Sequence, residues 1–143
     1  MLDREKLAES ILTFIPMLHR KLMKVYPTHE VSRQQLGLLF KINCNDRKPM
    51  SYYSEQMSIP KSNLTVLSDK LIDEGLIERI FDPNDRRVVI LGITEKGTEY
   101  LCQYKAELRQ EMIKMLGSFS DRDITRLNEL VEEIKTIIGK KGL

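Results

Sequence analysis

The chain lacks the features that define several large classes of protein. Its 143 residues include two cysteines, Cys44 and Cys102, whose separation fits neither a metal site nor a redox motif. With so few cysteines and no signal peptide, we expect a cytoplasmic protein whose cysteines are buried as small apolar side chains. Charged residues interrupt every apolar segment, so no stretch of the sequence is long enough to span a membrane.

Motifs for catalysis are missing as well. The chain has two histidines, His19 and His29, and neither belongs to a cluster of potential metal ligands. There is no glycine-rich phosphate loop and no nucleophile motif, so we expect no enzyme activity, no metal and no cofactor. The net charge of +2 is too small to indicate nucleic-acid binding by itself.

What the sequence does contain is helical periodicity at both ends. Apolar residues recur every three or four positions over 3–26, 95–116 and 124–138, which predicts three amphipathic helices. Pro16 predicts a kink or a break in the first of them. The first and last helices have more apolar surface than the centre of the chain can cover. We expect them to pair within the chain and across a two-fold axis, through a dimer interface that includes Leu7, Ile11, Leu130, Ile134 and Ile137.

The centre of the chain has the pattern of a helix-turn-helix. Ser32 is a predicted N-cap for a helix over 33–44, and Ser51 for a short helix ending at Met57. A predicted loop over 43–50 separates these two helices. A tight turn follows Met57, and Pro60 then precedes a helix over 61–74, which Gly75 ends. The start of this second helix is polar, as a helix that reads DNA requires. Its candidate DNA-binding residues are Lys61, Ser62, Asn63, Thr65 and Ser68.

A β-hairpin follows the helix-turn-helix. Residues alternate with a period of two over 76–81 and 88–93, and the second strand is rich in β-branched side chains. Between them, Pro83 favours a type I turn as its second residue. Arg86 and Arg87 lie near the tip, where Asp85 or Asp82 could hold a guanidinium in place. Thr94 is a predicted cap for the next helix, with Gly97 tolerated in its first turn.

These elements predict contact with both grooves of DNA. The polar helix fits the major groove, and an arginine on a thin hairpin can enter the narrow, electronegative minor groove. Between Lys61 and Lys96 there are six basic and seven acidic residues, so binding must depend on a few placed cations, helped by others such as Arg33, Arg47 and Lys48. A module that binds protein rather than DNA remains the alternative.

The residues of the hairpin also resemble those of a known family. The segment 82–97 is similar to the wing of the multiple antibiotic resistance regulator (MarR) family, and 59–76 is similar to its recognition helix. The family pattern falls on Asp85, Arg87, Leu91, Ile93, Thr94 and Gly97. The resemblance implies a mainly α fold with a small β-hairpin, forming one MarR-like domain over 1–143. A winged helix-turn-helix lobe would occupy 32–97, and dimerisation helices 1–30 and 98–143.

The resemblance also implies a function. Members of the family are homodimeric transcriptional regulators, so we expect a repressor of a pseudo-palindromic operator, with recognition helices about 34 Å apart. The partners would be double-stranded DNA, a second copy of the chain and a small phenolic or apolar anionic effector. For this effector the resemblance suggests a pocket near His19, Met23, Leu36 and Phe40.

Overall fold

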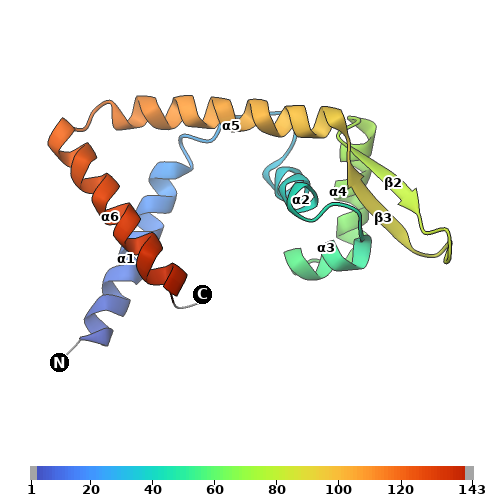
Figure 1. Ribbon diagram of the computed structural model, residues 1–143, viewed down its shortest axis with the longest axis horizontal. Coiled ribbons are helices and arrows are strands. Elements are labelled where there is room, and N and C mark those ends of the chain that lie inside the picture. Colours follow the sequence, from blue (N-terminus) through green and yellow to red (C-terminus); the bar gives the residue numbers. More distant parts are fainter. Residues whose placement is uncertain (1–2, 141–143) are drawn as a thin grey trace. The chain divides into compact units, whose positions relative to one another are not determined.

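The computed structural model describes residues 3–140 (Figure 1). The chain folds into two compact units. One unit is continuous, Thr28–Ala106, and contains the predicted helix-turn-helix and hairpin. The other combines the two ends of the chain, Met1–Pro27 and Glu107–Leu143. In the part of the chain that the structure describes, no helix is both long and apolar enough to cross a membrane.

The first helix of the continuous unit, α2 (Arg33–Cys44), begins at a complete capping box. The backbone N–H of Gln35 donates to Ser32 Oγ at 3.2 Å, and the N–H of Ser32 donates to Gln35 Oε1 at 2.7 Å. These two bonds satisfy donors that the helix itself leaves without partners. The prediction that Ser32 caps this helix is confirmed.

The next two helices, α3 (Met50–Met57) and α4 (Lys61–Asp73), form the helix-turn-helix. The N-cap of α3 is Pro49, without a side-chain cap, so the prediction that Ser51 caps this helix is wrong. Ser58 ends α3 in the left-handed conformation, with φ of 53°, and the turn leads to Pro60 at the start of α4. Gly75 follows α4 with φ of +73°, a conformation that costs glycine little, as predicted.

The sheet has three antiparallel strands in the order β1-β3-β2. Strands β2 (Ile77–Phe81) and β3 (Val89–Ile93) form the hairpin, with Arg79 opposite Leu91. The sequence predicts a loop over 43–50, whereas Lys48–Pro49 forms β1 and pairs with the outer edge of β3. Strand β1 was missed because two residues that include a proline show no alternation. Figure 1 shows the hairpin beside α4.

The start of α5 (Glu95–Leu116) is fastened to the end of α4. Thr94 Oγ1 accepts from the N–H of Gly97 at 3.0 Å and donates to the carbonyl of Gly75 at 2.6 Å, which confirms Thr94 as the cap. A Cβ on Gly97 would lie 2.0 Å from the carbonyl oxygen of Leu76. Gly97 is therefore required for this close approach, where the sequence reading had it merely tolerated.

The core of this unit lies between α2, α3, α4, the sheet and the first turns of α5. Its fully buried apolar side chains come from every one of these elements except β1, and they include Leu38, Leu39, Ile42, Tyr53, Leu64, Leu71, Ile77, Leu91 and Leu101. The phenol of Tyr53 donates to the carbonyl of Asn45 and accepts from the N–H of Lys48 at 3.2 Å. The loop before β1 is thereby tied to α3.

The other unit contains α1 (Arg4–Leu22), α6 (Asp121–Lys140) and the end of α5. Of the kink or break predicted at Pro16, the break is not observed, since α1 runs through Pro16. Neither α1 nor α6 buries a residue, so the predicted pairing of the two helices within the chain buries none of their apolar side chains. The five predicted dimer residues all remain exposed: Leu7, Ile11, Leu130, Ile134 and Ile137.

The two cysteines are exposed, so the prediction that they are buried is wrong. Cys44 is the last residue of α2, where Ile42 occupies the buried position two residues earlier. Cys102 follows the buried Leu101 and is turned away from it by the helical rotation of one residue. Hydropathy predicts burial on average, but helical phase decides it here.

Candidate nucleic-acid interface

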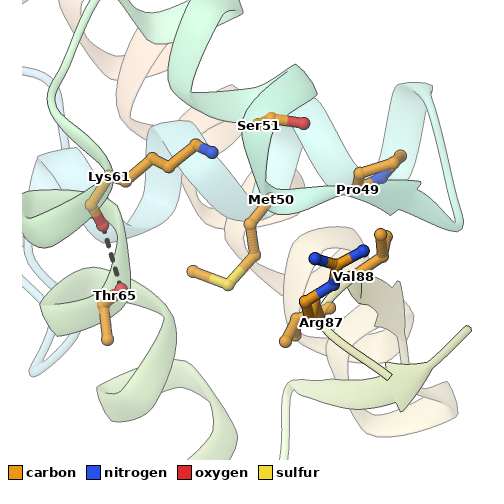
Figure 2. A pocket seen from close by; sticks show the side chains of 8 residues that line it. Pro49, Met50, Ser51, Lys61, Thr65, Arg87 and Val88 are labelled. Carbon is orange, nitrogen blue, oxygen red and sulfur yellow. Dashed lines mark hydrogen bonds between the residues drawn. The ribbon is translucent and has the colours of Figure 1, made fainter. Parts of the chain in front are cut away.

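The polar start of α4 lies on its exposed face. Leu64, Ser68 and Leu71 are buried and fix the side of the helix that faces the core. The remaining predicted residues of this helix are exposed, namely Lys61, Ser62, Asn63 and Thr65. Thr65 Oγ1 donates to the carbonyl of Lys61 at 2.9 Å, which keeps its methyl group and hydroxyl close to the helix surface (Figure 2).

Ser68 does not belong to this exposed set. Its side chain is fully buried, and its hydroxyl donates to the carbonyl of Thr65 at 3.0 Å. A serine in this position can pack against a core because that bond satisfies its hydroxyl within the helix. The prediction that Ser68 contacts DNA is therefore withdrawn.

The tip of the hairpin holds Arg87 through Asp85. The Asp85 carboxylate accepts from the backbone N–H of Arg87 at 3.0 Å and from its Nε at 3.2 Å. Both bonds, the backbone one foremost, hold the pKa of the Asp85 carboxyl below its ordinary value. The Arg87 side chain is 91% exposed despite this pairing. Asp85 thus orients the guanidinium through Nε and leaves most of the group open to a ligand.

The hydrogen-bonded turn of the hairpin differs from the predicted one. It runs from Asp85 to Val88, whose N–H donates to the Asp85 carbonyl at 3.0 Å, and so places Arg86 and Arg87 in its centre. Asp82 accepts from the N–H of Asn84 at 2.8 Å, which is an Asx turn around Pro83. Asp82 therefore shapes the loop, while Asp85 holds the arginine.

A hollow of about 220 Å³ joins the hairpin to the helix-turn-helix. Figure 2 shows Lys61 and Thr65 of α4 on one side, Arg87 and Val88 on the other, and Met50 at the start of α3 between them. No side chain caps this end of α3, where backbone N–H groups favour anions. Two cations and a helix N-terminus therefore line the same space.

Two other arginines of this unit, Arg47 and Arg79, are paired with acids. Arg79 Nη2 lies 2.7 Å from Asp69 Oδ1, and Arg47 lies 3.8 Å from Asp46 and 3.9 Å from Glu78. Of the three suggested helpers, Arg47 is therefore partly neutralised. Arg33 lies on α2 and Lys48 on β1, and both are exposed. Lys61 and Arg87 are the cations that line the hollow itself.

Sequence reasoning missed three residues of this surface. The sequence predicts a loop at Met50 and a cap at Ser51, whereas both residues line the hollow. Val66 lies exposed on α4 among the polar residues, and its apolar side chain does not by itself suggest contact with DNA. Its helical spacing of four residues from Ser62 was the signal that could have identified it.

The four residues suggested for an effector pocket are divided between the two units. His19 and Met23 belong to the unit formed by the chain ends, and Leu36 and Phe40 to the continuous one. Leu36 is buried, and the Phe40 ring lies 6.3 Å from that of Tyr104. Over residues 3–140, no group of three or more histidine, cysteine or acidic side chains is placed to hold a metal ion.

Comparison with known proteins identifies the architecture. Residues 31–89 match the sequence profile described as "MarR family". An uncharacterised HTH-type transcriptional regulator of Bacillus subtilis, YsmB, is 31% identical over 140 residues, covering 97% of this chain and 93% of that protein. The HTH-type transcriptional regulator BilQ of Clostridioides difficile is 28% identical over 148 residues, covering 98% and 100%.

Solved structures share the fold. The YusO protein of Bacillus subtilis superposes with a TM-score of 0.72 at 20% identity, covering 93% of this chain and 97% of that one. Apo MarR from E. coli superposes with a TM-score of 0.67 at 20% identity, covering 85% and 94%. The relatives are named as regulators of transcription, in agreement with the expectation that the chain is not an enzyme. This chain belongs to the MarR family of winged helix-turn-helix transcriptional regulators.

Proposed function

We propose that the protein is a homodimeric repressor that binds a pseudo-palindromic operator in the cytoplasm. In each protomer α4 enters the major groove and Arg87 enters the adjacent minor groove, with Arg86 beside it. The observation that carries this proposal is the shared hollow, because Lys61 and Arg87 come from separate elements and line one space. A phosphate of the DNA backbone that passes between the two grooves would meet both cations there.

The exposed apolar faces of α1 and α6 support the dimer. Seven large apolar side chains of α1 and six of α6 are more than a third exposed. Apolar surface of this extent is rare on monomers and is typical of a protein interface. Sedimentation equilibrium should give twice the chain mass of 16.7 kDa. A monomer at micromolar concentration would contradict the two-fold arrangement.

We also propose that a small phenolic or apolar anionic ligand releases the repressor from DNA. It would favour a dimer form whose recognition helices no longer match the half-site spacing, which is a population shift. His19, Met23, Leu36 and Phe40 are the candidate lining residues. Phe40 supports this choice, since its ring is near the Tyr104 ring, at 6.3 Å between centroids, and the Lys105 ammonium lies 5.6 Å from its centroid. Titration of the DNA complex with salicylate is the first test.

The test of DNA binding uses fluorescence anisotropy with duplexes from the promoter of the protein's own gene. Affinity should fall steeply as salt rises, because phosphate contacts release counterions. The Arg87→Ala variant should bind more than tenfold more weakly while remaining dimeric. Arg109→Ala is the matched control, since it removes an exposed arginine from the other unit and should change affinity less than twofold.

Two results would contradict the proposal. Affinity that does not depend on salt would indicate a module that binds protein rather than DNA. Equal affinity of Arg87→Ala and Arg109→Ala would remove the hairpin from the mechanism, whatever the role of α4.

A further inference from the structure

The continuous unit leaves two large apolar side chains exposed, and both lie on elements of the candidate interface. Within residues 28–106, all of which the structure describes, these are Val66 on α4, 61% exposed, and Phe81 at the end of β2, 59% exposed. The other large apolar side chains that are exposed belong to the unit formed by the chain ends. Val66 is therefore the one exposed large apolar side chain of α4, all of which the structure describes.

The phase of α4 places Val66 on the face turned away from the core. Leu64 and Leu71 mark the buried side, and Ser62 and Asp69 lie four residues before and three residues after Val66. Valine at an exposed helical position contributes no packing, and it has a lower helix propensity than Lys, Arg, Glu or Gln. Neither the core nor the helix itself accounts for a branched apolar side chain here.

The chemistry of the major groove supplies a partner for it. Among the base edges in that groove, the C5-methyl group of thymine is the apolar feature and accompanies one acceptor, O4, whereas guanine presents two acceptors and no apolar group. Val66 has no donor to offer those acceptors. The neighbouring Asp69 carboxylate, held by Arg79 at 2.7 Å, would be repelled by them. An apolar side chain beside a carboxylate therefore favours a thymine over a guanine.

We propose that Val66 contacts the C5-methyl group of a thymine in each half-site and makes that methyl group a determinant of operator recognition. This inference rests on the proposed function, since it requires α4 to lie in the major groove. Single exposed valines are common on protein surfaces. The test must therefore separate a contact with the methyl group from simple exposure.

The experiment begins with duplexes selected by the full-length protein from a randomised DNA library. Each thymine of the selected half-site is then replaced by deoxyuridine, which lacks only the methyl group, and affinity is measured by anisotropy at one salt concentration. At one position, deoxyuridine should weaken binding by about fourfold per half-site, the effect of exposing one methyl-sized group. Replacement in both half-sites should weaken it by about fifteenfold.

Variants connect this penalty to Val66. Val66→Ser should bind the thymine duplex as weakly as the wild type binds the deoxyuridine duplex, and it should not distinguish the two. Ser62→Ala, one turn earlier on the same face, should keep the deoxyuridine penalty whatever its affinity. Val66→Ala is a second substitution at the same position, in case Val66→Ser fails to fold. Circular dichroism and the dimer mass would reveal a loss of folding in either variant.

The outcomes separate the two proposals. If no duplex is selected, and promoter DNA is not bound either, the proposed function fails. If a duplex is selected but deoxyuridine has no effect at any position, or if the penalty persists unchanged in Val66→Ser and Val66→Ala, then the assignment of Val66 fails while DNA binding stands.

Discussion

Replacement of Gly97 by alanine tests the junction between the recognition helix, the hairpin and α5. The added Cβ would lie 2.0 Å from the carbonyl oxygen of Leu76 and 2.9 Å from Ile93 Cγ1. A Cβ atom does not lie closer than 3.0 Å to a heavy atom of another residue, so α5 and the backbone at Leu76 must separate. The Leu76 carbonyl cannot yield freely, because it accepts from the N–H of Thr94 at 3.2 Å.

The cost follows from these contacts. Overpacking in a well-packed site costs about 1–3 kcal/mol. Loss of the Thr94–Leu76 bond and of the Thr94 cap adds about 1 kcal/mol each. The better helix propensity of alanine returns about 1 kcal/mol. We therefore expect Gly97→Ala to lower the free energy of unfolding by about 2–4 kcal/mol, a large share of the 5–15 kcal/mol that is typical of a domain.

The assay is urea unfolding followed by far-UV circular dichroism, at one protein concentration because the chain is proposed to dimerise. Gly37→Ala is the matched control. It lies within α2 of the same unit, and its new Cβ would meet Met57 Cε at an ordinary distance of 3.9 Å. This control should gain about 0.5–1 kcal/mol. Equal midpoints for Gly97→Ala and Gly37→Ala would refute the reasoning about the junction.

Two further substitutions test the hydrogen bonds of the Tyr53 phenol and the N-terminal cap of α2. Tyr53→Phe leaves the carbonyl of Asn45 and the N–H of Lys48 without the phenol, so it should cost about 1–3 kcal/mol in urea unfolding. Burial raises the pKa of the Tyr53 phenol above its ordinary value of 10.0. Its contribution to stability should therefore be complete below pH 10 and be lost as pH rises through the raised pKa. A difference between wild type and Tyr53→Phe that stays constant above pH 10 would contradict this. Ser32→Ala removes one half of the capping box with Gln35 and should cost about 0.5–2 kcal/mol, whereas an unchanged midpoint would show that the cap contributes nothing.

The features that the sequence predicted correctly are those that depend on residues close to one another in the chain. Ser32 caps through Gln35, Gly75 adopts its own positive φ, and Thr94 caps through Gly97, so this chemistry is local and visible without the fold. The same holds for Asp85 and Arg87, which are two residues apart. Periodicity gave the helices and the two long strands for the same reason, since it depends on near neighbours.

The misses depend on segments that are distant in the sequence. β1 exists because Lys48 pairs with Leu91, and Gly97 is required because Leu76 lies against it. The burial of Ser68 could not be read from its polarity, since its hydroxyl is satisfied within the helix. The hollow beside Arg87 likewise joins three elements, and their approach to one another is a property of the packed unit.

The pairing of arginines with acids has a consequence for how such a regulator finds its operator. Affinity for random DNA comes almost entirely from phosphate contacts. Arg79 is engaged by Asp69, and Arg47 by Asp46 and Glu78, so these two arginines contribute less to holding an arbitrary sequence than unpaired cations would. Residence at each wrong site on the chromosome would be brief, and a small number of protein molecules could sample many sites between encounters with the operator.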